Sequence, residues 1–88
     1  MRRAHLQVYI APGCAGCDTA SLLAHRVRRL RPAHRVEIVD VSDPQATVPD
    51  AVIGTPAYVL EGAVYSLGNP DLDELLAELD KLAVGYDA

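Results

Sequence analysis

Eighty-eight residues, half of them hydrophobic, suit one small globular domain and argue against a disordered chain. The net charge of −4 is uneven, because seven arginines and one acid occupy residues 1–35, whereas Lys81 and eleven acids occupy residues 36–88. An acidic chain without a basic stripe interleaved with aromatic residues argues against nucleic-acid binding. No segment approaches the roughly 20 apolar residues that span a bilayer. We therefore expect a single domain over residues 1–88 that binds neither nucleic acid nor membrane.

The N-terminus carries no recognisable export signal, since the apolar stretch after Arg3 is short and is interrupted by Gln7. The two cysteines are only three positions apart, so a disulfide between them would close a loop too short to stabilise the fold much. A Cys-x-x-Cys pair in a chain without other cysteines is more typical of redox or metal chemistry than of scaffolding. We expect a cytoplasmic monomer.

The first half of the chain predicts a strand, a helix and a second strand. Residues 6–10 alternate between core-type apolar positions and intervening ones, as a strand does. From Cys17 to about Leu30 apolar residues recur at helical spacing, and Pro32 marks the end. Residues 36–41 form a second, β-branched strand. A strand–helix–strand unit of this length implies a right-handed parallel crossover.

The second half predicts a hairpin followed by a helix. The polar stretch at residues 42–51 is long enough for one or two helical turns. Residues 57–60 and 63–66 are short strands around the two-residue loop Glu61-Gly62. Asn69 and Pro70 are expected as the N-cap and first residue of a final helix with a leucine stripe.

Cys14 and Cys17 lie where the first strand gives way to the first helix, in the run PGCAGCD at residues 12–18. The unpaired N–H groups and the dipole of a helix N-terminus favour a thiolate over a thiol. Disulfide exchange needs an attacking thiolate and a second thiol that releases the mixed disulfide. Cys14 is therefore the candidate nucleophile and Cys17 the candidate resolving thiol.

This element order, with CxxC after the first strand and Thr55-Pro56 before the third, resembles the thioredoxin fold, and the start PGCxxCD resembles small glutaredoxin-like proteins. The resemblance covers nearly the whole chain. It implies an α/β fold with a four-stranded mixed sheet, in the order β-α-β-(short α)-β-β-α, with helices on both faces. It also implies a thiol–disulfide oxidoreductase without a cofactor or metal beyond the cysteine pair. Its partners would be a protein or small-molecule disulfide and, as electron donor, a reductase or a low-molecular-weight thiol.

The same resemblance implies a substrate groove beside the cysteines. Pro56 would follow a cis peptide bond, and the backbone of Thr55 would pair with an extended substrate. Gly68 and its neighbours would line the same groove. The substrate-binding residues implied in this way are Gly13, Thr55, Pro56, Gly68 and Asn69.

The chain departs from both groups of relatives at several positions. Gly13 stands where thioredoxins usually carry an aromatic residue, and Val8 stands where they carry a buried acid. Ala15-Gly16 replaces the Pro-Tyr that is frequent in glutaredoxins. No lysine or arginine in residues 4–13 offers a cation for a glutathione carboxylate. We therefore expect glutathione to be a poor partner.

Two alternatives to redox exchange remain open. The first is metal binding, although two sulfurs leave a zinc site two ligands short and the three histidines show no paired spacing. A metal carrier would then use the thiolates of two chains. The second is a redox-inert interaction module on the same fold, which would tolerate serine at both cysteine positions.

Overall fold

The computed structural model describes residues 3–85, which form a four-stranded sheet and two helices. The four strands and the two long helices expected from the sequence form with small shifts at their ends, whereas the short helix of the expected order does not form. Within residues 3–85, neither helix combines the length and apolar character needed to cross a membrane. The elements are β1 (His5–Ile10), α1 (Cys17–Leu30), β2 (Arg35–Asp40), β3 (Ala57–Leu60), β4 (Ala63–Leu67) and α2 (Leu72–Gly85).

The strand order in the sheet is β2-β1-β3-β4, with β1 near the centre. β1 runs parallel to β2, where Val8 lies opposite Ile38, and antiparallel to β3, where Val8 lies opposite Tyr58. β3 and β4 form the antiparallel hairpin. The parallel pair requires a crossover, and α1 supplies it. The mixed four-stranded sheet and the α/β class are confirmed.

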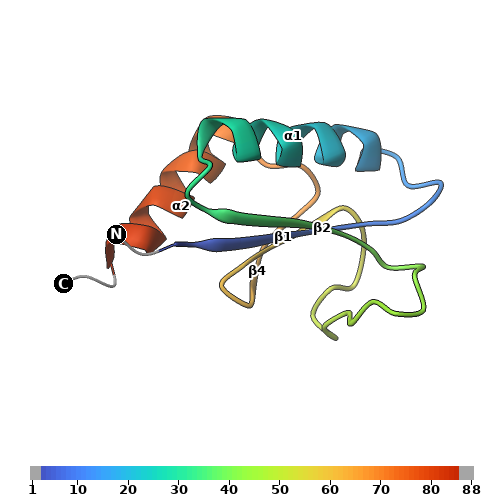
Figure 1. Cartoon of the computed structure of the whole chain (residues 1–88). Helices are drawn as coiled ribbons and strands as arrows, with labels where there is room; N and C mark the ends of the chain where they lie inside the picture. The colour runs from blue at the N-terminus through green and yellow to red at the C-terminus, as the bar shows by residue number, and fades with distance from the viewer. Residues whose placement is uncertain (1–2, 86–88) are drawn as a thin grey trace.

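Both helices pack on the same face of the sheet (Figure 1). Val8 and Tyr58 belong to one core cluster with Val27 of α1 and Leu79 of α2. Side chains alternate along a strand, so Tyr9 points to the opposite face, in the second cluster. The expectation of helices on both faces is therefore wrong.

The opposite face is covered by the loop between β2 and β3 instead of by a short helix. Residues 43–52 form turns, and Val48 and Val52 from this loop pack against the second cluster. Asp43 accepts a hydrogen bond from the backbone N–H of Gln45 at 2.9 Å, and such local bonds compete with helix formation. Pro49 lacks an N–H donor for a helical ladder. The short helix of the expected order is thus replaced by turns whose half-buried valines pack against the second cluster.

α2 begins at Leu72, later than expected, because Asp71 caps it. Asp71 Oδ2 accepts a hydrogen bond from the backbone N–H of Glu74 at 3.1 Å, as an N-cap carboxylate does. The prediction of Asn69 as the N-cap is wrong. The side chain of Asn69 has other partners, which belong to the site described below.

Asp80 ties the end of α1 to α2. Arg31 Nε donates to both carboxylate oxygens of Asp80, at 2.9 and 3.1 Å. Nδ1 of the buried His34 accepts the backbone N–H of Ala4 at 3.2 Å, so the ring proton is on Nε2. That Nε2–H donates to Asp80 Oδ1 at 3.3 Å. One carboxylate therefore connects two elements that cover the same face of the sheet.

We expect Asp80→Asn to reduce stability at neutral pH. The hydrogen bond from Arg31 is the largest cause that holds the pKa of Asp80 below its usual value. A lowered pKa in the folded state gives stability that is present above the unfolded pKa and is lost as the pH falls through the folded pKa. The decrease should lie within the range of about 0.2–1 kcal/mol found for partly exposed ion pairs. Urea unfolding at pH 7 measures it.

Urea unfolding of the two proteins at about pH 3 or below separates the contribution of the Asp80 charge from that of side-chain packing. The unperturbed pKa of an aspartate is about 3.9. Wild type and Asp80→Asn should converge there, because the wild-type carboxyl is then increasingly protonated. Asp50→Asn, at an exposed loop position, serves as the control and should change little at either pH. An Asp80→Asn deficit that is equally large in acid would contradict the ionic origin.

Candidate active site

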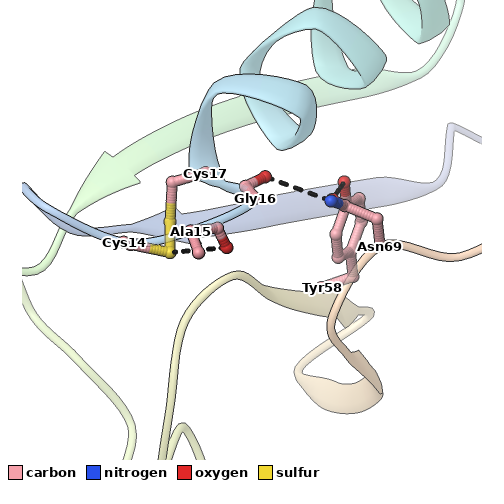
Figure 2. Close-up of a disulfide and its surroundings, with 6 residues drawn as sticks. All are labelled: Cys14, Ala15, Gly16, Cys17, Tyr58 and Asn69. Atoms are coloured by element: carbon pink, nitrogen blue, oxygen red, sulfur yellow. Dashed lines mark hydrogen bonds between the residues drawn. A yellow bond between two sulfur atoms is a disulfide. The ribbon is translucent and has the colours of Figure 1, made fainter.

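Cys14 and Cys17 form a disulfide at the start of α1, with their Cα atoms 5.4 Å apart (Figure 2). Cys17 is the first residue of the helix and is only 6 % exposed. Cys14 lies in the preceding loop and is half-buried. The two cysteines are therefore at bonding distance, and Cys14 is the more accessible of the pair.

The turn between the cysteines depends on a glycine. Gly16 is the N-cap of α1 and has a φ of 97°, a left-handed conformation that residues with a β-carbon seldom adopt. Its carbonyl accepts the N–H of Ala20 at 3.0 Å and so begins the helical ladder. The N–H of Cys17 donates to the carbonyl of Cys14 at 3.2 Å. The turn thus leads directly into the helix and leaves the cysteines at its N-terminal end.

Pro56 lies against this turn. The Thr55–Pro56 peptide bond is cis, as the sequence predicts. A β-carbon placed on Gly16 would lie 3.9 Å from Pro56 Cδ, so the proline ring is next to the residue between the cysteines. The carbonyl of Pro56 accepts the N–H of Gly68 at 2.7 Å, which brings the segment after β4 to the same place.

Asn69 joins this segment to the turn between the cysteines. Its Nδ2 donates to the carbonyl oxygen of Gly16 at 3.0 Å, and its Oδ1 accepts the hydroxyl proton of Tyr58 at 2.8 Å (Figure 2). Tyr58 is fully buried on β3, and burial raises its pKa to about 12. Its hydroxyl therefore stays protonated and remains a donor at neutral pH.

Tyr58 both packs in the core and forms a hydrogen bond through its hydroxyl. A buried tyrosine usually finds a hydrogen-bond partner for its hydroxyl, which is a signal that the sequence offered. The sequence did not identify Asn69 as this partner, because an asparagine immediately before a proline and near a helix start also suits an N-cap.

The structure therefore brings Pro56, Gly68 and Asn69 to the CxxC turn. Thr55, half-buried, directly precedes Pro56. Gly13 is exposed, and a β-carbon placed on it would meet no atom within 4 Å, so it faces open space.

Two large apolar side chains next to these residues in sequence are exposed. Ile53, two positions before Thr55, is 80 % exposed. Leu67, which directly precedes Gly68, is 50 % exposed. Apolar groups at such positions are available to a partner chain.

His5 and His34 have partners other than the cysteines. His5 pairs with Glu37, and His34 is held by Ala4 and Asp80. Among residues 3–85, no three or more His, Cys, Asp or Glu side chains are grouped so as to hold a metal ion. A metal site that used Cys14 and Cys17 would need ligands from beyond this part of the chain.

A CxxC disulfide at a helix N-terminus, a cis-proline against it and a mixed sheet with this topology define a thioredoxin-like domain. The chain belongs to the thioredoxin domain family, whose sequence pattern matches residues 4–80. The pair of cysteines at disulfide distance on this fold supports a thiol–disulfide redox role in general terms. No match was found among curated proteins.

Solved structures share the fold at low sequence identity. The oxidised crystal structure of mitochondrial thioredoxin 3 from Saccharomyces cerevisiae matches with a TM-score of 0.64 and 16% identity, over 91% of this chain and 79% of that one. A chain from a study of thiol resolution in yeast mitochondrial 1-Cys peroxiredoxin, via glutathione/thioredoxin systems, gives a TM-score of 0.65 and 15% identity, with the same coverage of 91% and 79%. A designed protein, E_1r26, gives 0.66 and 21%, over 98% and 78%. At these identities the likeness establishes the fold.

Proposed function

We propose that this protein is a thiol–disulfide oxidoreductase with Cys14 as the nucleophile and Cys17 as the resolving thiol. The observation that carries the proposal is the pair's placement, with Cys17 buried as the first residue of α1 and Cys14 more accessible before it. The helix N-terminus favours the thiolate form of a nearby cysteine. Burial keeps Cys17 away from external disulfides and leaves it available to attack Cys14.

The exchange consists of two displacements at sulfur. The Cys14 thiolate attacks one sulfur of a substrate disulfide, forms a mixed disulfide and expels the other substrate sulfur as a thiolate that takes up a proton. Cys17 then loses its proton and attacks the Cys14 sulfur, which closes the Cys14–Cys17 disulfide and expels the second substrate thiol. Two electrons pass from the dithiol to the substrate, and an external reductant restores the dithiol.

We assign the substrate groove to Gly13, Thr55, Pro56, Gly68 and Asn69. Thr55 lies outside the ladder of β3, whose pairing with β1 ends at Ala57, so its backbone can pair with an extended chain. Pro56 has no N–H, and its carbonyl is bonded to Gly68. These contacts support a groove in which Thr55 offers the polar backbone groups, two positions after the exposed Ile53.

The electron donor in this proposal is a reductase or a small thiol other than glutathione, in a reducing compartment such as the cytoplasm. The segment before the cysteines, residues 4–13, contains no lysine or arginine for a glutathione carboxylate. Ala15-Gly16 also supplies no tyrosine edge between the cysteines. Both absences support a donor other than glutathione.

Catalysed reduction of a model protein disulfide tests the proposal. With dithiothreitol as reductant, the protein should accelerate the reduction of insulin disulfides, and the double variant Cys14→Ser/Cys17→Ser should not. No acceleration over dithiothreitol alone would contradict the redox function. In parallel, NADPH consumption compares a glutathione/glutathione-reductase system with a thioredoxin-reductase system. Turnover with glutathione that equals the turnover of a glutaredoxin would contradict the choice of donor.

A further inference from the structure

The side-chain amide of Asn69 has an orientation that its two partners determine. Its carbonyl oxygen accepts the hydroxyl proton of the buried Tyr58, so its NH₂ group must be the one that faces the Gly16 carbonyl (Figure 2). Tyr58 is part of the core beneath both helices and provides a fixed anchor. Asn69 therefore connects the rigid core to the turn between the cysteines.

This contact helps to hold the plane of one particular peptide unit, that between Gly16 and Cys17. The C=O of Gly16 and the N–H of Cys17 belong to the same planar trans peptide, so they point in opposite directions. Asn69 holds the C=O, and the N–H points to the Cys14 side, where it donates to the Cys14 carbonyl at 3.2 Å. The same C=O also accepts the N–H of Ala20 at 3.0 Å, so Asn69 adds a side-chain bond to a peptide that the first turn of α1 already orients.

We propose that Asn69 is a positioning residue for the redox centre. By supporting the Gly16–Cys17 peptide at the start of α1, it keeps the positive end of the helix dipole beside Cys14 and so stabilises the Cys14 thiolate of the reduced pair. The inference rests on the proposed function, since it concerns the reactivity of the same cysteines. Loss of the contact should weaken the reduced form relative to the disulfide and make Cys14 less reactive.

Three variants separate positioning from simple structural support. Asn69→Ala removes the bond to Gly16. Tyr58→Phe keeps the buried ring but removes the hydroxyl that orients Asn69. Ser66→Ala is the matched control, because the Ser66 hydroxyl donates to the carbonyl of Gly68 at 2.9 Å and thus supports the same segment without touching the CxxC turn.

The main measurement is the equilibrium of the Cys14–Cys17 disulfide with dithiothreitol buffers, read by quantitative alkylation. Asn69→Ala should shift this equilibrium toward the disulfide by about three- to tenfold, the effect of one hydrogen bond. Tyr58→Phe should shift it less and in the same direction, and Ser66→Ala should leave it unchanged. The rate of Cys14 alkylation by iodoacetamide at pH 7 should fall in the same order.

A merely structural role gives a different result. In that case Asn69→Ala would lower the unfolding free energy of the oxidised and reduced forms equally and leave the equilibrium unchanged, which would overturn the proposal. If Asn69→Ala does not fold, an unshifted equilibrium in Tyr58→Phe would overturn it. None of these measurements needs a protein substrate or a reductase. A failed insulin assay together with a shifted equilibrium would therefore reject the proposed function while supporting the positioning role.

Discussion

Serine at position 14 is expected to abolish disulfide exchange, with turnover falling by at least about a thousandfold, as the loss of a catalytic nucleophile does. The hydroxyl of serine is not ionised at neutral pH and cannot form a mixed disulfide. Cys17 does not substitute for Cys14, because it is only 6 % exposed as the first residue of α1. Insulin reduction and mass spectrometry of the protein with a disulfide substrate measure the loss.

Cys17→Ser should behave differently and accumulate mixed disulfides through Cys14. The first displacement remains available in this variant, but no internal thiol releases the substrate. Because the position is buried, Cys17→Ala is the matched variant that removes the thiol without adding a buried hydroxyl. Both should trap substrate on Cys14. In the reduced wild type, alkylation should modify Cys14 first. Faster labelling of Cys17, or substrate trapped by Cys14→Ser, would reverse the assignment.

The elements of the fold could be predicted because their signals are local. The alternation in residues 6–10 and the helical spacing up to Leu30 each depend on a few neighbouring residues, and both elements form. The face covered by each element depends on distant packing. Val48 and Val52 have neither helical nor strand periodicity, yet they pack, partly buried, against the second face from a loop. The sequence pattern could not show that this face would be covered without a helix.

The candidate site also contains residues that local motifs predict and a contact that only the folded chain shows. Cys14, Cys17 and the cis-proline belong to short motifs with a recognisable spacing, and the structure places Pro56 against the turn between the cysteines. The bond from Asn69 to Gly16 joins residues 53 positions apart, and no periodicity or spacing rule indicates such a contact. In the sequence Asn69 competes with Asp71 for the role of helix cap. The geometry of the chain, in which Asp71 reaches the helix, decides between them.

Leu79→Ala is expected to be the most destabilising single truncation considered in this protein, at about 2–5 kcal/mol. Leu79 is fully buried on α2 in the core cluster that also contains Val8 and Tyr58. Alanine loses the transfer free energy of the removed carbons and leaves a cavity that the sheet fills only partly. A domain of this size has a total stability of only about 4–13 kcal/mol, so the variant should lose a large share of it.

Urea unfolding of the oxidised protein, followed by far-UV circular dichroism, measures this loss. Leu22→Ala is the matched control, since Leu22 is 66 % exposed on α1 and its truncation should change stability by no more than about 0.5 kcal/mol. A similar small change for Leu79→Ala would show that α2 is not part of the cooperative core. Because α2 and Tyr58 share that core, Leu79→Ala should also weaken the anchor of Asn69. We therefore expect its disulfide equilibrium to shift in the direction of the Tyr58→Phe variant.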